Sequence, residues 1–398
     1  MSEPPLKNTL VLDFSTLLAG PVAATFPGDF GATVIKIEEP GTGEFTRMIP
    51  VYPDGRSPSW LVEGRNKKCI TLNLRTPEGQ AIARRLAEKA DVIVMNFRPG
   101  QAEAWHLGPE DLHRTNPKLV ILLVSAYGQT GPYAGKGGFD RTAQAFAGIT
   151  YVTGYPDRPP VRSGYALVDY MTAYLGAFAV MMALYNRDVH GAGGEVIDLS
   201  LVETALRASE SSITAYSMTG NVREREGNRN PWIVPADDFE SKDGRLVVIN
   251  AGIPKLWERL VQAMGKPELL EDPRFRTAPA RIQNQEEVYR IVGEWVKGYI
   301  AEEVVRILDE VKVPADMIRN VADLATDPHL REREAVLERE APGIGSVLIP
   351  GVFPKLSRHP GEIRFLGAKL GEHNEEIYLG ELGMTREKLA ALKEKGVI

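Results

Sequence analysis

The chain has 398 residues, which is enough for two or three domains with a substantial core. Its 43% hydrophobic and 25% charged residues are typical of a globular protein, and a net charge of -6 argues against nucleic acid as a partner. The single cysteine, Cys69, excludes an intrachain disulfide. The first residues lack a signal peptide's apolar segment, and the longest apolar run, residues 177–185, is too short to span a membrane. These features predict a cytoplasmic protein that has no membrane partner.

The first half of the chain alternates short apolar segments with helical patterns. Strands are expected at residues 9–15, 33–40, 68–74, 91–97 and 118–128. Thr76 is expected to cap a helix over residues 77–90, with Pro77 at its first position. Continuous apolar strands separated by helices are typical of a parallel sheet that is covered on both faces. The sequence therefore predicts an α/β fold.

The pattern changes in the second half. A long helix over residues 170–187 and a strand over 194–200 are followed by a polar stretch at 220–232. Beyond it, one strand and several helices predict a smaller α+β domain at residues 225–325. Residues 1–220 and 330–398 are assigned to the large domain. The C-terminal segment is expected to contain strands at 346–351 and 362–367 and helices at 373–383 and 385–396.

Several common chemistries lack their residues here. The turn after the first strand, "STLLAGPVAA", has one glycine, whereas a dinucleotide site needs G-x-G-x-x-G so that the backbone can approach the pyrophosphate. The six histidines show no H-x-x-x-H spacing, and Cys69 stands alone, so no metal site is predicted. No G-x-S-x-G motif marks a serine nucleophile.

Asp169 is the one charged residue in the apolar stretch from Ser163 to Leu184. Aspartate directly before a helix is usually an N-cap that accepts backbone N–H bonds. The same position would also fix a partly desolvated carboxylate, which can act as a nucleophile. Local sequence leaves both roles open. Asp140 is expected to cap the helix that follows it rather than to act as a second catalytic acid.

Nine segments together resemble one known family. They are "VLDFSTLLAGP", "GATVIKIEEPGTGEFTR", "RNKKCITLNLRTPEG", "ADVIVMNFRPG", "SAYGQTGPYAGKGGFD", "GYALVDY", "GEVIDLSLVETAL", "GNRNP" and "LGEHNEEIY". In this order they resemble the class III CoA-transferases, the group that contains formyl-CoA:oxalate and carnitine CoA-transferases. The resemblance covers nearly the whole chain.

The resemblance implies a large Rossmann-like domain built from both chain ends, a smaller domain between them, and an interlocked homodimer. It implies CoA transfer from an acyl-CoA, with succinyl-CoA as a reasonable donor, to a free carboxylic acid. Asp169 matches the catalytic aspartate, which forms a mixed anhydride and then an aspartyl-CoA thioester. The CoA thioester is a substrate, and no permanently bound cofactor is implied.

The resemblance also implies a set of CoA-binding positions. They are Leu17, Leu18, Ala19, Leu72, Arg75, Asn96, Phe97, Arg98 and Lys136. Two positions depart from the pattern of some members, because Glu39 and Ala104 stand where those members carry basic residues. The chain has no tetraglycine loop, which argues against formyl-CoA and oxalate as substrates.

Two other functions stay open. An acyl-CoA racemase or isomerase on the same fold would need a histidine base where this chain has Phe139 before Asp140. A dehydrogenase-like nucleotide binder is supported by the β-α-β pattern alone. For the acceptor, the candidates to hold a distal carboxylate are Arg141, Arg162 and Arg229. Gly164 and Ala166 are interpreted as leaving room for substrate beside Asp169.

Overall fold

The computed structural model describes residues 3–49 and 57–398. The chain forms two compact units. The first comprises Met1–Ile149, Ser163–Ser211 and His329–Ile398, and the second comprises Thr150–Arg162 and Ser212–Pro328. The predicted small domain, residues 225–325, lies within the second unit. That unit begins earlier, at residue 212, and also contains residues 150–162.

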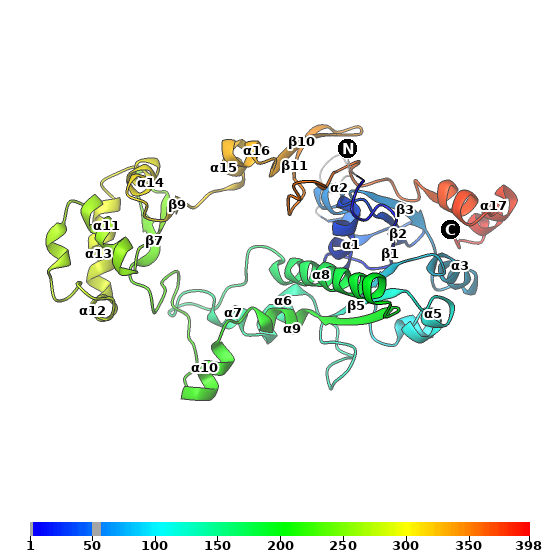
Figure 1. Ribbon diagram of the computed structural model, residues 1–398, viewed down its shortest axis with the longest axis horizontal. Coiled ribbons are helices and arrows are strands. Elements are labelled where there is room, and N and C mark those ends of the chain that lie inside the picture. The colour runs from blue at the N-terminus through cyan, green and yellow to red at the C-terminus, as the bar shows by residue number, and fades with distance from the viewer. Residues whose placement is uncertain (1–2, 50–56) are drawn as a thin grey trace. The chain divides into compact units, whose positions relative to one another are not determined.

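A six-stranded parallel sheet forms the centre of the first unit and confirms the predicted α/β fold (Figure 1). Its strands are β1 (Leu10–Asp13), β2 (Thr33–Glu38), β3 (Lys67–Thr71), β4 (Val92–Met95), β5 (Val120–Ser125) and β6 (Glu195–Ser200). Their order is β3-β2-β1-β4-β5-β6. The chain therefore winds outward from β1 in one direction and, from β4 onward, in the other. The point of reversal lies between β1 and β4, which pair directly.

Helices cover both faces of this sheet because both faces are apolar. Val11 and Leu12 are neighbours in β1, each 0% exposed, yet they belong to opposite hydrophobic clusters. One face packs against α1 (Ala19–Asp29), α6 (Asp140–Phe146), α8 (Leu167–His190) and α9 (Leu201–Arg207). The other face packs against α3 (Pro77–Ala87), α5 (Pro109–Thr115), η3 (Glu376–Glu381) and α17 (Arg386–Glu394).

The remaining elements of this unit are short. They are η1 (Phe45–Arg47), α2 (Pro58–Glu63), α4 (Gln101–Ala104) and the antiparallel pair β10 (Val336–Ala341) and β11 (Gly345–Pro350). Thr76 caps α3 as predicted, since its side chain accepts a bond from the Gly79 amide. The predicted strand at 362–367 is wrong. Asn66 holds this segment instead, because its side chain accepts from the Arg364 amide and its backbone amide donates to the Phe365 carbonyl.

The second unit has its own core. Its antiparallel sheet comprises β7 (Ala236–Glu240), β8 (Leu246–Asn250) and β9 (Ala315–Met317). Its helical elements are α10 (Ser212–Thr219), α11 (Pro254–Ala263), η2 (Pro267–Leu270), α12 (Ala278–Gln283), α13 (Gln285–Val296), α14 (Ala301–Glu310) and α15 (Val321–Thr326). Two further short helices, α7 (Ile149–Val152) and α16 (Pro328–Glu332), lie at the divisions between the units. The buried cluster lies between Val234 and Val313.

The long helix α8 packs against α1, β5 and β6. Gly176 allows this approach, because a Cβ atom there would lie 3.0 Å from a Leu122 methyl group and 3.3 Å from a Leu199 methyl group. Among the described residues, α8 is the one helix long and apolar enough to cross a membrane by length and composition. A core helix of a globular protein meets the same criteria, and α8 has a buried face in this unit.

Candidate active site

A cavity of about 220 Å³ opens at the carboxyl ends of the parallel strands. The loops after β1, β4, β5 and β6 all contribute to it. Its lining residues are Thr16, Leu17, Leu18, Ala19, Asn96, Phe97, Arg98, Pro99, Val124, Ser125, Ala126, Lys136, Gly137, Gly138, Phe139, Asp169 and Leu201. In open parallel sheets, ligands bind outside the carboxyl ends where the strand order reverses. The cavity includes the loops after β1 and β4, the two strands at this reversal.

Asp169 lines the cavity from the first turn of α8. Its side chain is not the N-cap, which was one of the two roles that the local sequence left open. The helix begins at Leu167, its N-cap is Ala166, and no side chain of that residue caps it. Asp169 is therefore the third helical residue. Its carboxylate is free to face the cavity because another residue supplies the cap.

Asp140 caps the helix that carries Asp169. Its Oδ1 accepts hydrogen bonds from the backbone amides of Val168 at 2.7 Å and Asp169 at 3.2 Å. Its Oδ2 accepts from Gln144 Nε2 at 2.5 Å, and Gln144 also bonds Ser163 just before α8. Asp140 was predicted to cap its own helix, α6, but it is the first residue of that helix and acts on α8 instead.

The surroundings of Asp169 change its acidity. Burial in the apolar start of α8 is the main cause, and the nearby carboxylate of Asp140 is the second; together they raise the pKa of Asp169 to about 7. Both effects disfavour the carboxylate form. A carboxyl group in a cavity with so large a shift is a candidate functional group.

The loop after β1 is held in an unusual conformation. Leu17 has a φ of 69°, in the left-handed region that residues with a Cβ atom rarely adopt. Asn96 holds the preceding residue on both sides: its Oδ1 accepts from the Thr16 amide at 2.9 Å, and its Nδ2 donates to the Thr16 carbonyl at 2.7 Å. Asn96, predicted as a CoA ligand, thus also fixes the loop that lines the cavity.

The structure brings most of the predicted site residues together. Those that line the cavity are Leu17, Leu18, Ala19, Asn96, Phe97, Arg98, Lys136 and Asp169. Leu72 and Arg75 do not line it. The Leu72 side chain is only 1% exposed, and the exposed Arg75 forms an ion pair of 2.7 Å with Glu39, one of the two departures noted in the sequence.

Sequence reasoning missed nine lining residues, which are Thr16, Pro99, Val124, Ser125, Ala126, Gly137, Gly138, Phe139 and Leu201. For Thr16 and Leu201 the available signal was their position directly after a predicted strand. Neither Gly164 nor Ala166 lines the cavity, although a Cβ atom on Gly164 would meet nothing within 4 Å.

The three candidate acceptor arginines are not part of this cavity. Arg229 and Arg162 belong to the second unit. The Arg229 guanidinium forms ion pairs with Asp237 and Glu286. Arg141 is exposed at the start of α6. The cationic side chains that do line the cavity are Arg98 and Lys136.

Within residues 3–49 and 57–398, no group of three or more histidine, cysteine, aspartate or glutamate side chains could hold a metal ion. No histidine lines the cavity in this described part of the chain, and Phe139 occupies the position where the racemase hypothesis needs one. The cavity therefore offers a carboxyl group, two cations, the polar side chains of Thr16, Asn96 and Ser125, backbone amides and apolar side chains.

A comparison with family models matches residues 6–374 to the model described as CoA-transferase family III. The chain belongs to this family. CoA-transferases of family III use CoA thioesters as substrates, and this chain is a CoA-transferase.

Named relatives and solved structures agree with this membership. The chain is 42% identical to succinyl-CoA–D-citramalate CoA-transferase of Chloroflexus aurantiacus over 99% of this chain and 98% of the relative. It is 40% identical to the beta subunit of succinyl-CoA–L-malate CoA-transferase of the same organism, over 99% and 98%. A CAIB/BAIF family protein from Brucella suis has a similar structure, with a TM-score of 0.83, 30% identity, and coverage of 95% and 99%.

Proposed function

We propose that the enzyme transfers CoA from succinyl-CoA to a second dicarboxylic acid through a covalent intermediate on Asp169. The observation that carries this proposal is the position of the Asp169 carboxyl group. It lies in the cavity at the carboxyl edge of the sheet, in the first turn of α8, while Asp140 takes the capping role. The donor and the acceptor class follow from the names of the citramalate and malate relatives.

The reaction has two symmetrical halves. The Asp169 carboxylate attacks the thioester carbonyl of the donor, which forms a mixed anhydride and releases CoA thiolate. The thiolate then attacks the aspartyl carbonyl, so that the donor acid leaves as a carboxylate and an aspartyl-CoA thioester remains. The acceptor carboxylate attacks this thioester, and the released thiolate finally attacks the acceptor carbonyl of the new anhydride. The products are the acceptor thioester and free Asp169 carboxylate.

Each addition step creates an oxyanion, which needs hydrogen-bond donors. We assign this role to the amides at the start of α1. Leu18 is its N-cap and provides no side-chain cap, and the first turn carries no acidic residue. Among the described residues, no hydrogen-bond partner is found for the amides of Leu18, Ala19 and Gly20. Leu18 and Ala19 line the cavity, and the positive end of a helix dipole favours negative charge.

We propose that the first unit is the CoA-binding domain and that Arg98 and Lys136 hold CoA phosphates or the pantetheine arm. The Lys136 ammonium lies 3.8 Å from the centre of the Tyr133 ring, which restrains it at the cavity edge. Arg75 is a more distant candidate, since a phosphate there would compete with Glu39. Leu72 contributes through its backbone, because its side chain is buried.

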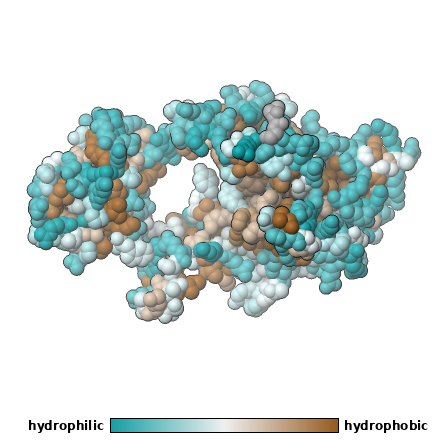
Figure 2. Space-filling view, viewed as in Figure 1, coloured by the Kyte–Doolittle hydropathy of each residue, from teal (hydrophilic) through white to brown (hydrophobic). Residues whose placement is uncertain are grey.

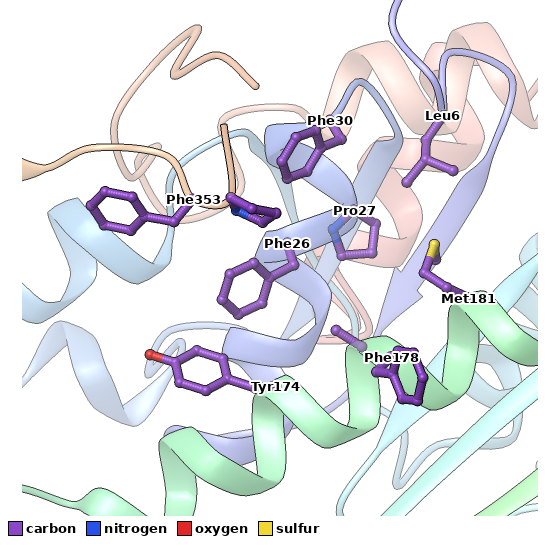
Figure 3. Close-up of a pocket in the computed structure, with 10 residues that line it drawn as sticks. Leu6, Phe26, Pro27, Phe30, Tyr174, Phe178, Met181 and Phe353 are labelled. Atoms are coloured by element: carbon purple, nitrogen blue, oxygen red, sulfur yellow. The ribbon is translucent and has the colours of Figure 1, made fainter. Parts of the chain in front are cut away.

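We also propose a homodimer, which the exposed face of α8 supports. Large side chains on this face recur at intervals of three and four residues and are more than half exposed: Tyr174, Phe178, Met182, Tyr185 and Val189. Figure 2 shows hydrophobic residues on the surface over this helix. Beside them lies an apolar cavity of about 520 Å³ between α1 and α8. Phe26, Phe30 and Phe178 are among the residues that line it (Figure 3). Patches of this kind mark interaction sites.

The experiment combines exchange and trapping. Succinyl-CoA is mixed with a panel of dicarboxylates, and new CoA thioesters are separated by chromatography; a parallel reaction contains hydroxylamine to trap the aspartyl intermediate as a hydroxamate at position 169. We expect exchange with at least one hydroxy-dicarboxylate, a mass shift at Asp169, and complete loss of both in Asp169→Ala. Near-normal turnover by Asp169→Ala would refute the nucleophile assignment. Exchange by the wild-type enzyme without any adduct would refute the covalent route.

A further inference from the structure

Four charged side chains lie buried beneath the loop after β1. This buried charge network consists of Asp13, Lys36, Glu44 and Lys67, none of them more than 4% exposed. They come from the end of β1, from the interior of β2, from the residue before η1, and from the start of β3. Buried charges are costly unless they are paired, so a network of this kind requires close partners.

The partners are close and mutual. Lys36 Nζ lies 3.0 Å from Glu44 Oε2 and 3.4 Å from Asp13 Oδ1, and it also donates to the Ser15 carbonyl. Lys67 Nζ lies 3.0 Å from Asp13 Oδ2. Burial alone disfavours the Asp13 carboxylate, but the two ammonium groups outweigh that effect and hold the pKa of Asp13 below its usual value. The two ammonium groups therefore hold Asp13 in its carboxylate form at neutral pH.

Glu44 connects this network to the cavity. One oxygen, Oε2, pairs with Lys36, while the other, Oε1, accepts bonds from the Leu17 amide at 2.7 Å and the Thr16 hydroxyl at 3.1 Å. The Leu17 amide is thus tied to a buried carboxylate at the one residue of the loop with a positive φ. The next residues are Leu18 and Ala19, which begin α1 and line the cavity.

A second ion pair fixes Glu44 itself. Glu38 Oε2 accepts the backbone amide of Glu44 at 2.9 Å. The Arg47 guanidinium binds both Glu38 oxygens, at 2.6 and 2.7 Å, and lies 3.8 Å from the centre of the Trp60 ring. These contacts restrict the position of the Glu44 carboxylate. They therefore also restrict the loop after β1, which donates hydrogen bonds to it.

We propose that Glu44 is a positioning residue for CoA transfer, and that Lys36 acts through it by holding its carboxylate against the Leu17 amide. The inference rests on the proposed function, because the groups it positions are the amides at the start of α1. The left-handed conformation of Leu17 is disfavoured by itself, so it needs this external hold. When the hold weakens, the following amides no longer point at the position where the oxyanion forms.

The main test uses Glu44→Gln and Lys36→Met. Glutamine keeps the size of the side chain and one acceptor oxygen. It has no negative charge, so it cannot accept from the Leu17 amide and form an ion pair with Lys36 at the same time. We expect kcat to fall about 10- to 100-fold while the KM for succinyl-CoA changes little, because misplaced donors impair the transition state more than binding. The matched control is Asp29→Asn, which removes a buried carboxylate paired to Arg65 at 2.7 Å, remote from the loop. We expect its kcat to stay that of the wild type.

The double variant Lys36→Met/Glu44→Gln tests whether Lys36 acts through Glu44. We expect it to be no slower than Glu44→Gln alone, because two residues in one chain of contacts are not additive. Multiplied defects, or wild-type kcat in folded Glu44→Gln, would overturn the proposal. If the variants of buried residues do not fold, Thr16→Val replaces them as the test. It removes only the hydroxyl that donates a hydrogen bond to Glu44. We expect a smaller fall in kcat.

A readout independent of catalysis separates this inference from the proposed function. Amide hydrogen exchange of the peptide 16–20 should be slow in the wild type at Leu17 and faster in Glu44→Gln, with Asp29→Asn unchanged. If the wild-type enzyme transfers no CoA, the proposed function fails. Hydrogen exchange in this peptide would still show whether Glu44 restrains the Leu17 amide. Unchanged hydrogen exchange in Glu44→Gln would overturn the positioning role by itself.

Discussion

Two aspartates meet at the first turn of α8, where Asp140 of α6 caps the helix and Asp169 of α8 lines the cavity. Asp140 accepts the backbone amides of Val168 and Asp169, although it lies 28 residues earlier in the chain. Asp169 lines the cavity and has a raised pKa. A cap supplied by a distant residue leaves the local carboxylate available for chemistry, whereas a local cap would consume it.

The pH dependence of the first step should follow from this pair. Asp169 has a pKa of about 7, and its carboxylate form is the proposed nucleophile, so acylation should slow as the pH falls through 7. Asp140→Asn removes the repulsion but keeps an oxygen for the Val168 amide. We expect the midpoint of single-turnover acylation to move below 7 and to stay above the usual range, because burial remains the larger cause.

The control for this shift is Asp272→Asn, which removes a partly exposed carboxylate of the second unit. Its midpoint should equal that of the wild type. A midpoint for Asp140→Asn that is unchanged or higher would contradict the assigned electrostatic cause.

At this scale, the family segments single out Asp169, whereas the local sequence leaves it open as an N-cap or a nucleophile. The reason is that Ala166, Leu167 and Val168 carry no capping side chain, so the pattern favoured the next polar residue as the cap. No local pattern relates Asp140 to α8, because that contact exists only after the sheet brings α6 and α8 together. The bonds from Asn96 to Thr16 were missed for the same reason.

The elements of the first unit follow their sequence patterns closely where burial is complete. All six strands of the parallel sheet were predicted. For β1 to β5 the reason is that strands covered on both faces form apolar runs, whereas β6 was predicted although its first four residues are not buried. The small antiparallel strands β7, β9 and β10 were missed because their sequences, ADDFE, ADM and VLEREA, contain charged residues instead of an apolar run. The segment 362–367 has the composition of a strand, but tertiary bonds from Asn66 override that tendency.

The exposed face of α8 makes the homodimer testable. Phe178 is 60% exposed on this face and borders the apolar cavity. Covering a phenylalanine side chain contributes about 1.5–3 kcal/mol, so Phe178→Glu should weaken a dimer strongly. We expect a single species of twice the chain mass by light scattering for the wild type and a monomer for the variant.

The matched control is Phe146→Glu, which changes an exposed phenylalanine outside α8. It should leave the dimer intact. A wild-type protein that is monomeric at micromolar concentration, or a Phe178→Glu variant that stays dimeric, would contradict this role of α8.

For the whole molecule, the division into two units implies that the second unit can fold alone. Its core lies between Val234 and Val313, and the buried Arg281 side chain links three of its segments by hydrogen bonds. The buried Arg281 guanidinium donates to the carbonyls of Val234, Phe275 and Gly252. Every one of these contacts falls within a single stretch of chain.

We therefore expect a fragment of residues 229–328 to be folded, with cooperative thermal unfolding followed by circular dichroism. Arg281→Ala should abolish that transition, because three buried carbonyl groups lose their donors. Arg290→Ala, at an exposed ion pair in the same unit, should lower the midpoint only slightly. A fragment without a cooperative transition would contradict the independence of this core.

The buried charge network has a consequence for recombination between relatives. Asp13, Lys36, Glu44 and Lys67 form a balanced set of two anions and two cations within the first 67 residues. A chimera with a crossover inside this window inherits part of the set from each parent. Where the parents balance their charges differently, such a chimera buries an unmatched charge under the loop that lines the cavity, whereas a crossover after Lys67 transfers the whole set together.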